Sequence, residues 1–138
     1  MTNKKDLEQL AETRLGDARH LFAGGRYSAA YYLAGYAVEL GIKACIAGVF
    51  QANVIPDRNF VAAVYSHKLD ELLGLAGIKK QLQDDMKADR ALSAAWGVAS
   101  KWTETSRYDF WDEFAAASMI EAVGSQDHGV LQWLKKRW

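Results

Sequence analysis

The stretch from Gly25 to Phe50, GRYSAAYYLAGYAVELGIKACIAGVF, contains only three charged side chains, Arg26, Glu39 and Lys43. Apolar or small residues occupy every face of the helix that this stretch predicts, and a helix of that kind is typically buried. The stretch is long enough to span a bilayer, but its charges, tyrosines and glycines argue against insertion. We therefore expect a buried core helix and no membrane association.

The chain as a whole predicts one all-α domain over residues 1–138, because it has a single proline and no strand-like alternation. The formal net charge is zero, so the basic signature of a general nucleic-acid binder is absent. Cys45 is the only cysteine, which excludes an internal disulfide and a cysteine-based zinc site. The charged N-terminus lacks the apolar run of a signal peptide. We expect a cytoplasmic protein.

We expect an up-and-down four-helix bundle with one or two extra short helices. Asn3 is a plausible cap of the first helix, Gly24 and Gly25 end it, and Ser66 is a candidate cap of a short helix. The main helices are expected at residues 4–23, 26–50, 78–102 and 111–123, and short ones at 67–77 and 130–138.

Two faces of the helix over residues 26–50 differ in character. One face is apolar and suits a core: Ala30, Ala34, Val38, Ile42 and Cys45. The other is a polar, aromatic stripe of Tyr32, Tyr36, Glu39 and Lys43 at helical spacing. This stripe is compatible with a ligand cleft, in which tyrosines stack on bases and Lys43 contacts a phosphate. The residues by themselves favour a Glu39–Lys43 pair on a partly exposed edge, with tyrosines at an interface.

Two charges interrupt the apolar stripes of other helices, Arg14 in the first and Asp89 in the helix expected at 78–102. A buried lone charge costs several kcal/mol, so each needs a partner. We predict that Arg14 and Asp89 form an interhelical ion pair.

The three histidines show no metal-ligand spacing, so no metal site is expected. His67 begins a short helix close to Asp70 and Glu71, which favours a capping role and a surface contact with a carboxylate. His20 and His128 lie near helix ends with no carboxylate pattern around them. No cofactor motif is present either, so no cofactor is expected.

The segment WTETSRYDFW, which contains Trp102, Glu104, Arg107, Tyr108 and Trp111, is rich in binding chemistry. Arginine beside aromatic rings holds phosphates and bases, and it also forms hot spots of protein interfaces. The cluster of Lys135, Lys136 and Arg137 near the C-terminus is expected to be a solvated helix end.

The order of GRYSAAYYLAGYAVELGIKACI, then SHKLDELL, then W…KWTETSRY resembles the HEPN domain (higher eukaryotes and prokaryotes nucleotide-binding) from about Leu7 to Val123. The resemblance implies a helical bundle that forms a homodimer and is often partnered by a minimal nucleotidyltransferase in toxin–antitoxin-like pairs. Many members are metal-independent ribonucleases with an Arg-x4-6-His motif at the start of the last long helix. Here Asp112, Glu113 and Phe114 stand where that histidine would follow Arg107.

The resulting prediction is a non-catalytic, dimer-forming module that binds a nucleotide or RNA. In this hypothesis Lys43 and Arg107 contact phosphate, Tyr36 and Tyr108 stack or hydrogen-bond, and Glu39 orients Lys43 or Arg107. One alternative is a metal-independent endoribonuclease in which Arg107 stabilises phosphate charge and His67 is the acid or base. The other is a structural protein-interaction module.

Overall fold

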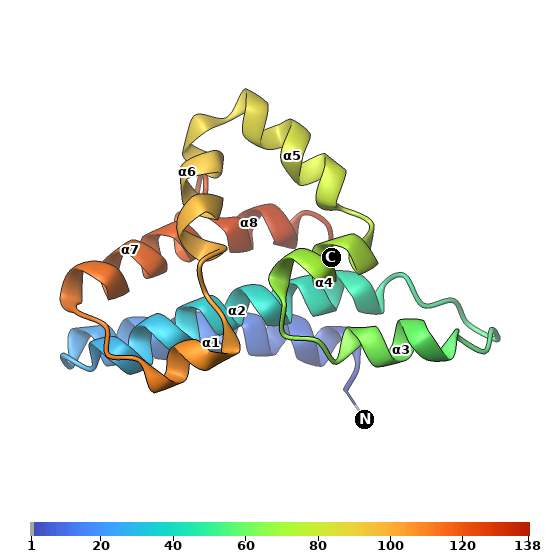
Figure 1. Ribbon diagram of the computed structural model, residues 1–138, viewed down its shortest axis with the longest axis horizontal. Coiled ribbons are helices and arrows are strands. Elements are labelled where there is room, and N and C mark those ends of the chain that lie inside the picture. Colours follow the sequence, from blue (N-terminus) through green and yellow to red (C-terminus); the bar gives the residue numbers. More distant parts are fainter. Residues whose placement is uncertain (1) are drawn as a thin grey trace.

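Two long antiparallel helices, α1 (Lys4–Ala23) and α2 (Tyr27–Ala47), lie side by side (Figure 1). The computed structural model describes residues 2–138, and these residues contain helices and no strand. The predicted all-α class is therefore confirmed. The remaining elements are α3 (Arg58–Val64), α4 (Leu69–Ala76), α5 (Lys79–Ala88), α6 (Arg90–Ala99), the 3-10 helix η1 (Glu104–Tyr108), α7 (Glu113–Gly124) and α8 (Val130–Lys135).

The bounds of α1 follow from local capping. The side chain of Asn3 accepts a hydrogen bond from the backbone N–H of Asp6, which satisfies one free donor of the first turn. At the other end, Gly25 adopts a φ of 77° that most side chains disfavour, and the chain turns back into α2. Both predicted helix ends are confirmed.

Helix α2 is buried because neighbours surround it: it packs against α1, α4, α7, α8 and η1. All five residues of its predicted core face are buried: Ala30, Ala34, Val38, Ile42 and Cys45. Burial on nearly every face explains why the sequence of α2 is so apolar. Within the described residues, no helix is both long enough and apolar enough to cross a membrane.

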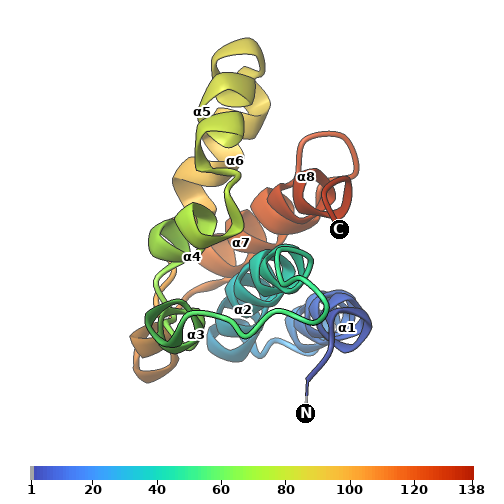
Figure 2. The ribbon, with the colours of Figure 1, turned by 90° about the vertical axis from the view of Figure 1, so that its right-hand side faces the viewer.

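The helix expected over residues 78–102 is two helices, α5 and α6, which meet at Asp89. Asp89 leaves helical geometry, and its side chain accepts hydrogen bonds from the N–H groups of Ala91 and Leu92, so it caps α6. Helices α5 and α6 project away from α1 and α2 (Figure 2). The predicted Arg14–Asp89 pair is wrong: Arg14 bonds to Asp17 on its own helix, at 3.0 Å.

Three other expectations need correction. A helix that was not expected, α3, follows the cap Asp57, whose side chain accepts from the N–H of Phe60. The cap of α4 is Lys68, and the Ser66 hydroxyl instead accepts a hydrogen bond from the Lys68 N–H. Helix α7 begins only after Asp112, whose side chain caps it.

The basic C-terminal cluster is not simply a solvated helix end. Arg137 donates to a carboxylate oxygen of Asp85 at 2.9 Å, and its guanidinium lies 3.5 Å from the centre of the Trp133 ring. Lys135 forms an ion pair with Glu12. These contacts hold α8 against α5 and α1.

Candidate functional site

Glu39, in the middle of α2, is the most deeply buried charged side chain among the described residues, with 1% of its surface exposed. A carboxylate in such a position needs cationic or hydrogen-bonding partners. Lys43, one turn along the same helix, lies with its Nζ 3.3 Å from Glu39 Oε2. Nδ1 of His67 lies 2.8 Å from Glu39 Oε1. Both carboxylate oxygens are thus in contact with a basic group.

His67 reaches Glu39 from the turn that precedes α4. Its other ring nitrogen, Nε2, lies 3.3 Å from an oxygen of Glu104 at the start of η1. A neutral imidazole carries one N–H, so only the protonated ring can donate to both carboxylates at once. Glu39, His67 and Glu104 therefore form a chain that runs from the core to the surface.

The outer end of this chain opens into a pocket between three segments. The lining residues come from the start of α4, from α6 and from the connection into η1: His67, Lys68, Leu69, Asp70, Trp96, Ser100, Trp102, Thr103, Glu104 and Thr105. The pocket therefore combines hydroxyl groups, charges of both signs and indole rings. Such a mixture suits a ligand with a flat ring and polar substituents.

Three aromatic rings support one side of this pocket. Tyr32, Tyr36 and Trp102 pack against one another with ring centroids 5.6–6.2 Å apart. The indole N–H of Trp102 donates to the carbonyl oxygen of Tyr32 at 3.0 Å. Burial raises the pKa of Tyr36, and the nearby negative charge of Glu39 raises it further. The Tyr36 ring is therefore a packed, partly buried group.

Arg107 and Tyr108 form a separate, exposed pair on η1. Arg107 donates to the Tyr108 hydroxyl at 3.1 Å, and its guanidinium lies 4.9 Å from the centre of the Tyr108 ring. The hydrogen bond to Tyr108 raises the pKa of Arg107, and the nearby Tyr32 raises it further. Side chains three residues apart eclipse in a 3-10 helix, so Arg107 lies on the same side of η1 as Glu104.

The predicted site residues therefore fall into two neighbouring groups. Glu39 and Lys43 do form the expected pair, but it is buried, and only 15% of the Lys43 side chain is exposed. Arg107 and Tyr108 lie together on η1, with Tyr32 of α2 nearby. No contact joins Glu39 to Arg107 among the hydrogen bonds and ion pairs of residues 2–138.

Sequence reasoning missed the partners of His67, which are Glu39 and Glu104 and not the expected neighbours Asp70 and Glu71. It also missed Trp96, which lines the pocket from α6. One signal was present: a glutamate in the middle of a buried helix requires basic partners, and His67 is the basic residue at the start of a nearby short helix.

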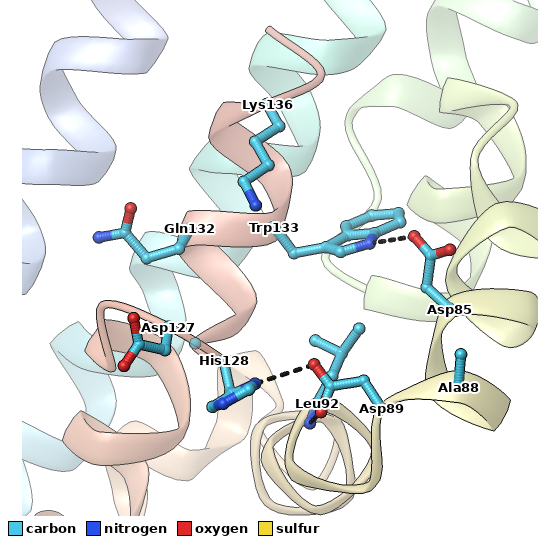
Figure 3. Close-up of a pocket in the computed structure, with 10 residues that line it drawn as sticks. Asp85, Ala88, Asp89, Leu92, Asp127, His128, Gln132, Trp133 and Lys136 are labelled. Atoms are coloured by element: carbon cyan, nitrogen blue, oxygen red, sulfur yellow. Dashed lines mark hydrogen bonds and ion pairs between the residues drawn. The ribbon is translucent and has the colours of Figure 1, made fainter.

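A second pocket lies at the start of α6, between the α5–α6 bend and α8 (Figure 3). There His128 points at Asp89, with 2.9 Å between Nδ1 and Oδ2, and the indole of Trp133 donates to Asp85 at 2.8 Å. The hydrogen bond with His128 lowers the pKa of Asp89. The expectation that His128 lacks a carboxylate partner is thus wrong. These contacts tie two parts of the fold together.

Among known families, the family model for the HEPN domain matches residues 5–136, which is nearly the whole chain. The domains of this family are nucleotide-binding and ribonuclease-like. The chain has no significant match among curated proteins or among solved structures.

Proposed function

Because the chain belongs to the HEPN domain family, we propose that it is a module that binds a nucleotide or RNA without cleaving it. The observation that carries this proposal is the exposed Arg107–Tyr108 pair beside a pocket lined by indole rings and hydroxyl groups. In this proposal the Arg107 guanidinium contacts phosphate and the Tyr108 ring, 72% exposed, stacks on a base.

The arrangement changes the roles of the α2 residues in the proposal. Lys43 is engaged with Glu39 and largely covered, so it serves to balance the buried carboxylate. Tyr36 packs on Trp102 and supports the pocket wall. Glu39 contacts and orients His67, whereas we expected it to orient Lys43 or Arg107.

Binding is tested by fluorescence anisotropy with a labelled single-stranded RNA of about ten nucleotides, and by competition with nucleotides, all in EDTA. We expect saturable binding that weakens at least about tenfold in Arg107→Ala and in Tyr108→Ala, since a lost stacking contact costs roughly 1–3 kcal/mol per base. Arg90→Ala removes an exposed arginine of α6 and is the matched control. An equal loss of affinity in Arg90→Ala, or binding that does not saturate, contradicts the proposal.

The Glu39–His67 contact favours a second candidate function, a metal-independent endoribonuclease. A histidine held by a buried carboxylate is oriented for proton transfer, and Arg107 is the cation available to a phosphate. RNA cleavage in EDTA that disappears in both His67→Ala and Arg107→Ala supports this candidate. Intact RNA after prolonged incubation with the wild-type protein excludes it.

We also propose that the protein acts as a homodimer and that a minimal nucleotidyltransferase is its partner in a toxin–antitoxin-like pair. Support comes from two highly exposed rings that follow Arg107 in the sequence, Phe110 and Phe114, at 98% and 81% exposure. Exposed aromatic residues of this kind are typical of protein contacts. Light scattering of the wild-type protein and of Phe110→Ser/Phe114→Ser tests the dimer, which the double substitution should weaken. An unchanged mass contradicts a role for these rings.

A further inference from the structure

Glu39 has two basic partners, and Lys43 alone matches its charge. A protonated His67 ring therefore has a second N–H to offer to another anion. Nδ1 faces the buried oxygen of Glu39 at 2.8 Å, so Nε2 is the ring nitrogen left for that anion. Nε2 is directed to the pocket side, where its partner is Glu104.

The contact with Glu104 is the weaker of the two. Its 3.3 Å separation exceeds the 2.8 Å of the Glu39 contact, and charge-assisted N–H···O bonds are usually about 2.7–2.9 Å long. The Glu104 side chain is 46% exposed, and ion pairs at such positions contribute little because water competes for both groups. An exposed carboxylate held in this way can be displaced by another anion.

We infer that the pocket binds a phosphate group at Nε2 of His67, in the place that the Glu104 carboxylate occupies. Phosphate offers more acceptor oxygens than a carboxylate, and hydrogen-bond donors from Lys68, Ser100, Thr103 and Thr105 line the same pocket. Trp96 adds an indole ring to the wall, which suits a phosphate attached to a base.

This inference rests on the proposed nucleotide or RNA binding and specifies it. Glu104 and Arg107 lie on one side of η1, so one ligand can reach both His67 and Arg107 when Glu104 moves aside. The phosphate belongs either to a terminal monoester or to a backbone diester. Both have the same chemistry at Nε2, and the experiment distinguishes them.

The test is an NMR titration of the histidine ring signals, with the His67 signals assigned by His67→Asn. Inorganic phosphate, 5′-AMP as a monoester and a dinucleoside monophosphate as a diester are added separately to the wild-type protein, to Glu104→Gln and to Glu113→Gln. Glu113 is an exposed carboxylate at the start of α7 that does not line the pocket, so its variant controls for the loss of one negative charge.

We expect saturable shifts of the His67 signals and roughly fivefold tighter phosphate binding in Glu104→Gln, the factor that corresponds to the loss of a competing exposed ion pair. Glu113→Gln should bind within about twofold of the wild type. Equal affinity in Glu104→Gln and the wild type, or shifts confined to His20 and His128, overturns the inference. Preference for 5′-AMP assigns the site to monoesters, and preference for the dinucleotide assigns it to diesters.

The outcomes separate this inference from the proposed function. Phosphate binding at His67 without any RNA or nucleotide binding means that the broader proposal fails and the phosphate site stands. RNA binding that depends on Arg107 but leaves the His67 signals unmoved means that the phosphate site alone is wrong.

Discussion

The indole ring of Trp102 lies directly against the backbone of Gly35, so closely that a side chain on residue 35 would overlap it. This contact, with the hydrogen bond from the indole N–H to the Tyr32 carbonyl, anchors the segment between α6 and η1 on α2. This segment lines the pocket, and η1, which follows it, carries Glu104 and Arg107. A glycine in a central helix thus positions the candidate site.

Gly35→Ala should destabilise the protein by about 1–3 kcal/mol, because the added methyl group displaces Trp102 from a well-packed position. Gly16→Ala, in the middle of α1, is the matched control: an added Cβ there meets no neighbouring atom. That substitution should stabilise by up to about 1 kcal/mol through helix propensity. Urea denaturation measures both free energies of unfolding. A stabilised Gly35→Ala would show that the indole moves without cost.

Glu39→Ala should destabilise the protein, because the largely covered Lys43 loses its counter-charge and His67 loses a hydrogen-bond partner. The loss should fall somewhat below the about 3–5 kcal/mol of a fully buried pair, since His67 remains partly solvated. Glu104→Ala, at the exposed end of the same chain, should change stability by less than about 1 kcal/mol. Chemical denaturation of the two variants gives the comparison, and equal losses would contradict this account.

Asp89 should make stability depend on pH in the acid range. The hydrogen bond with His128 lowers its pKa in the folded protein, whereas an aspartate in the unfolded chain has a pKa of about 3.9. The stabilisation is therefore present above that value and is lost as the pH falls through the folded-state pKa. Asp89→Asn should keep the helix cap but lose this dependence, so its stability should approach that of the wild type on acidification.

The matched control for this pH dependence is Asp112→Asn. Asp112 caps α7 through the Ala115 N–H and has no histidine partner. Unfolding is measured in urea at pH 6 and at several values below pH 4. A constant difference between wild type and Asp89→Asn over this range would contradict the role assigned to His128.

Cys45 should be almost unreactive in the folded protein. Burial raises the pKa of its thiol to about 11, and its Sγ donates to the Leu134 carbonyl at 3.8 Å. The thiolate is the reactive form, so the thiolate fraction at pH 8 is roughly 200-fold smaller than for a free cysteine. Reaction with a disulfide reagent should be slow in buffer and fast in guanidinium chloride. Rapid reaction of the native protein would contradict the burial of Cys45.

Local features of the sequence determined a large part of the fold. The ends of α1 follow from Asn3 and Gly25, because capping and turn geometry depend on residues three or four apart. The buried face of α2 and the Glu39–Lys43 pair follow from helical periodicity. The HEPN family was also recognisable at this level, since its motifs are short segments in a set order.

Only the tertiary structure decided which distant groups meet. Glu39 contacts His67, Asp89 contacts His128, and the indole of Trp102 packs against Gly35. The break at Asp89 was hidden because the apolar period continues on both sides of it. Periodicity and capping act over a few residues, whereas these pairs depend on how whole helices pack. That packing is the summed result of many side chains, which is why no single stretch of sequence specifies it.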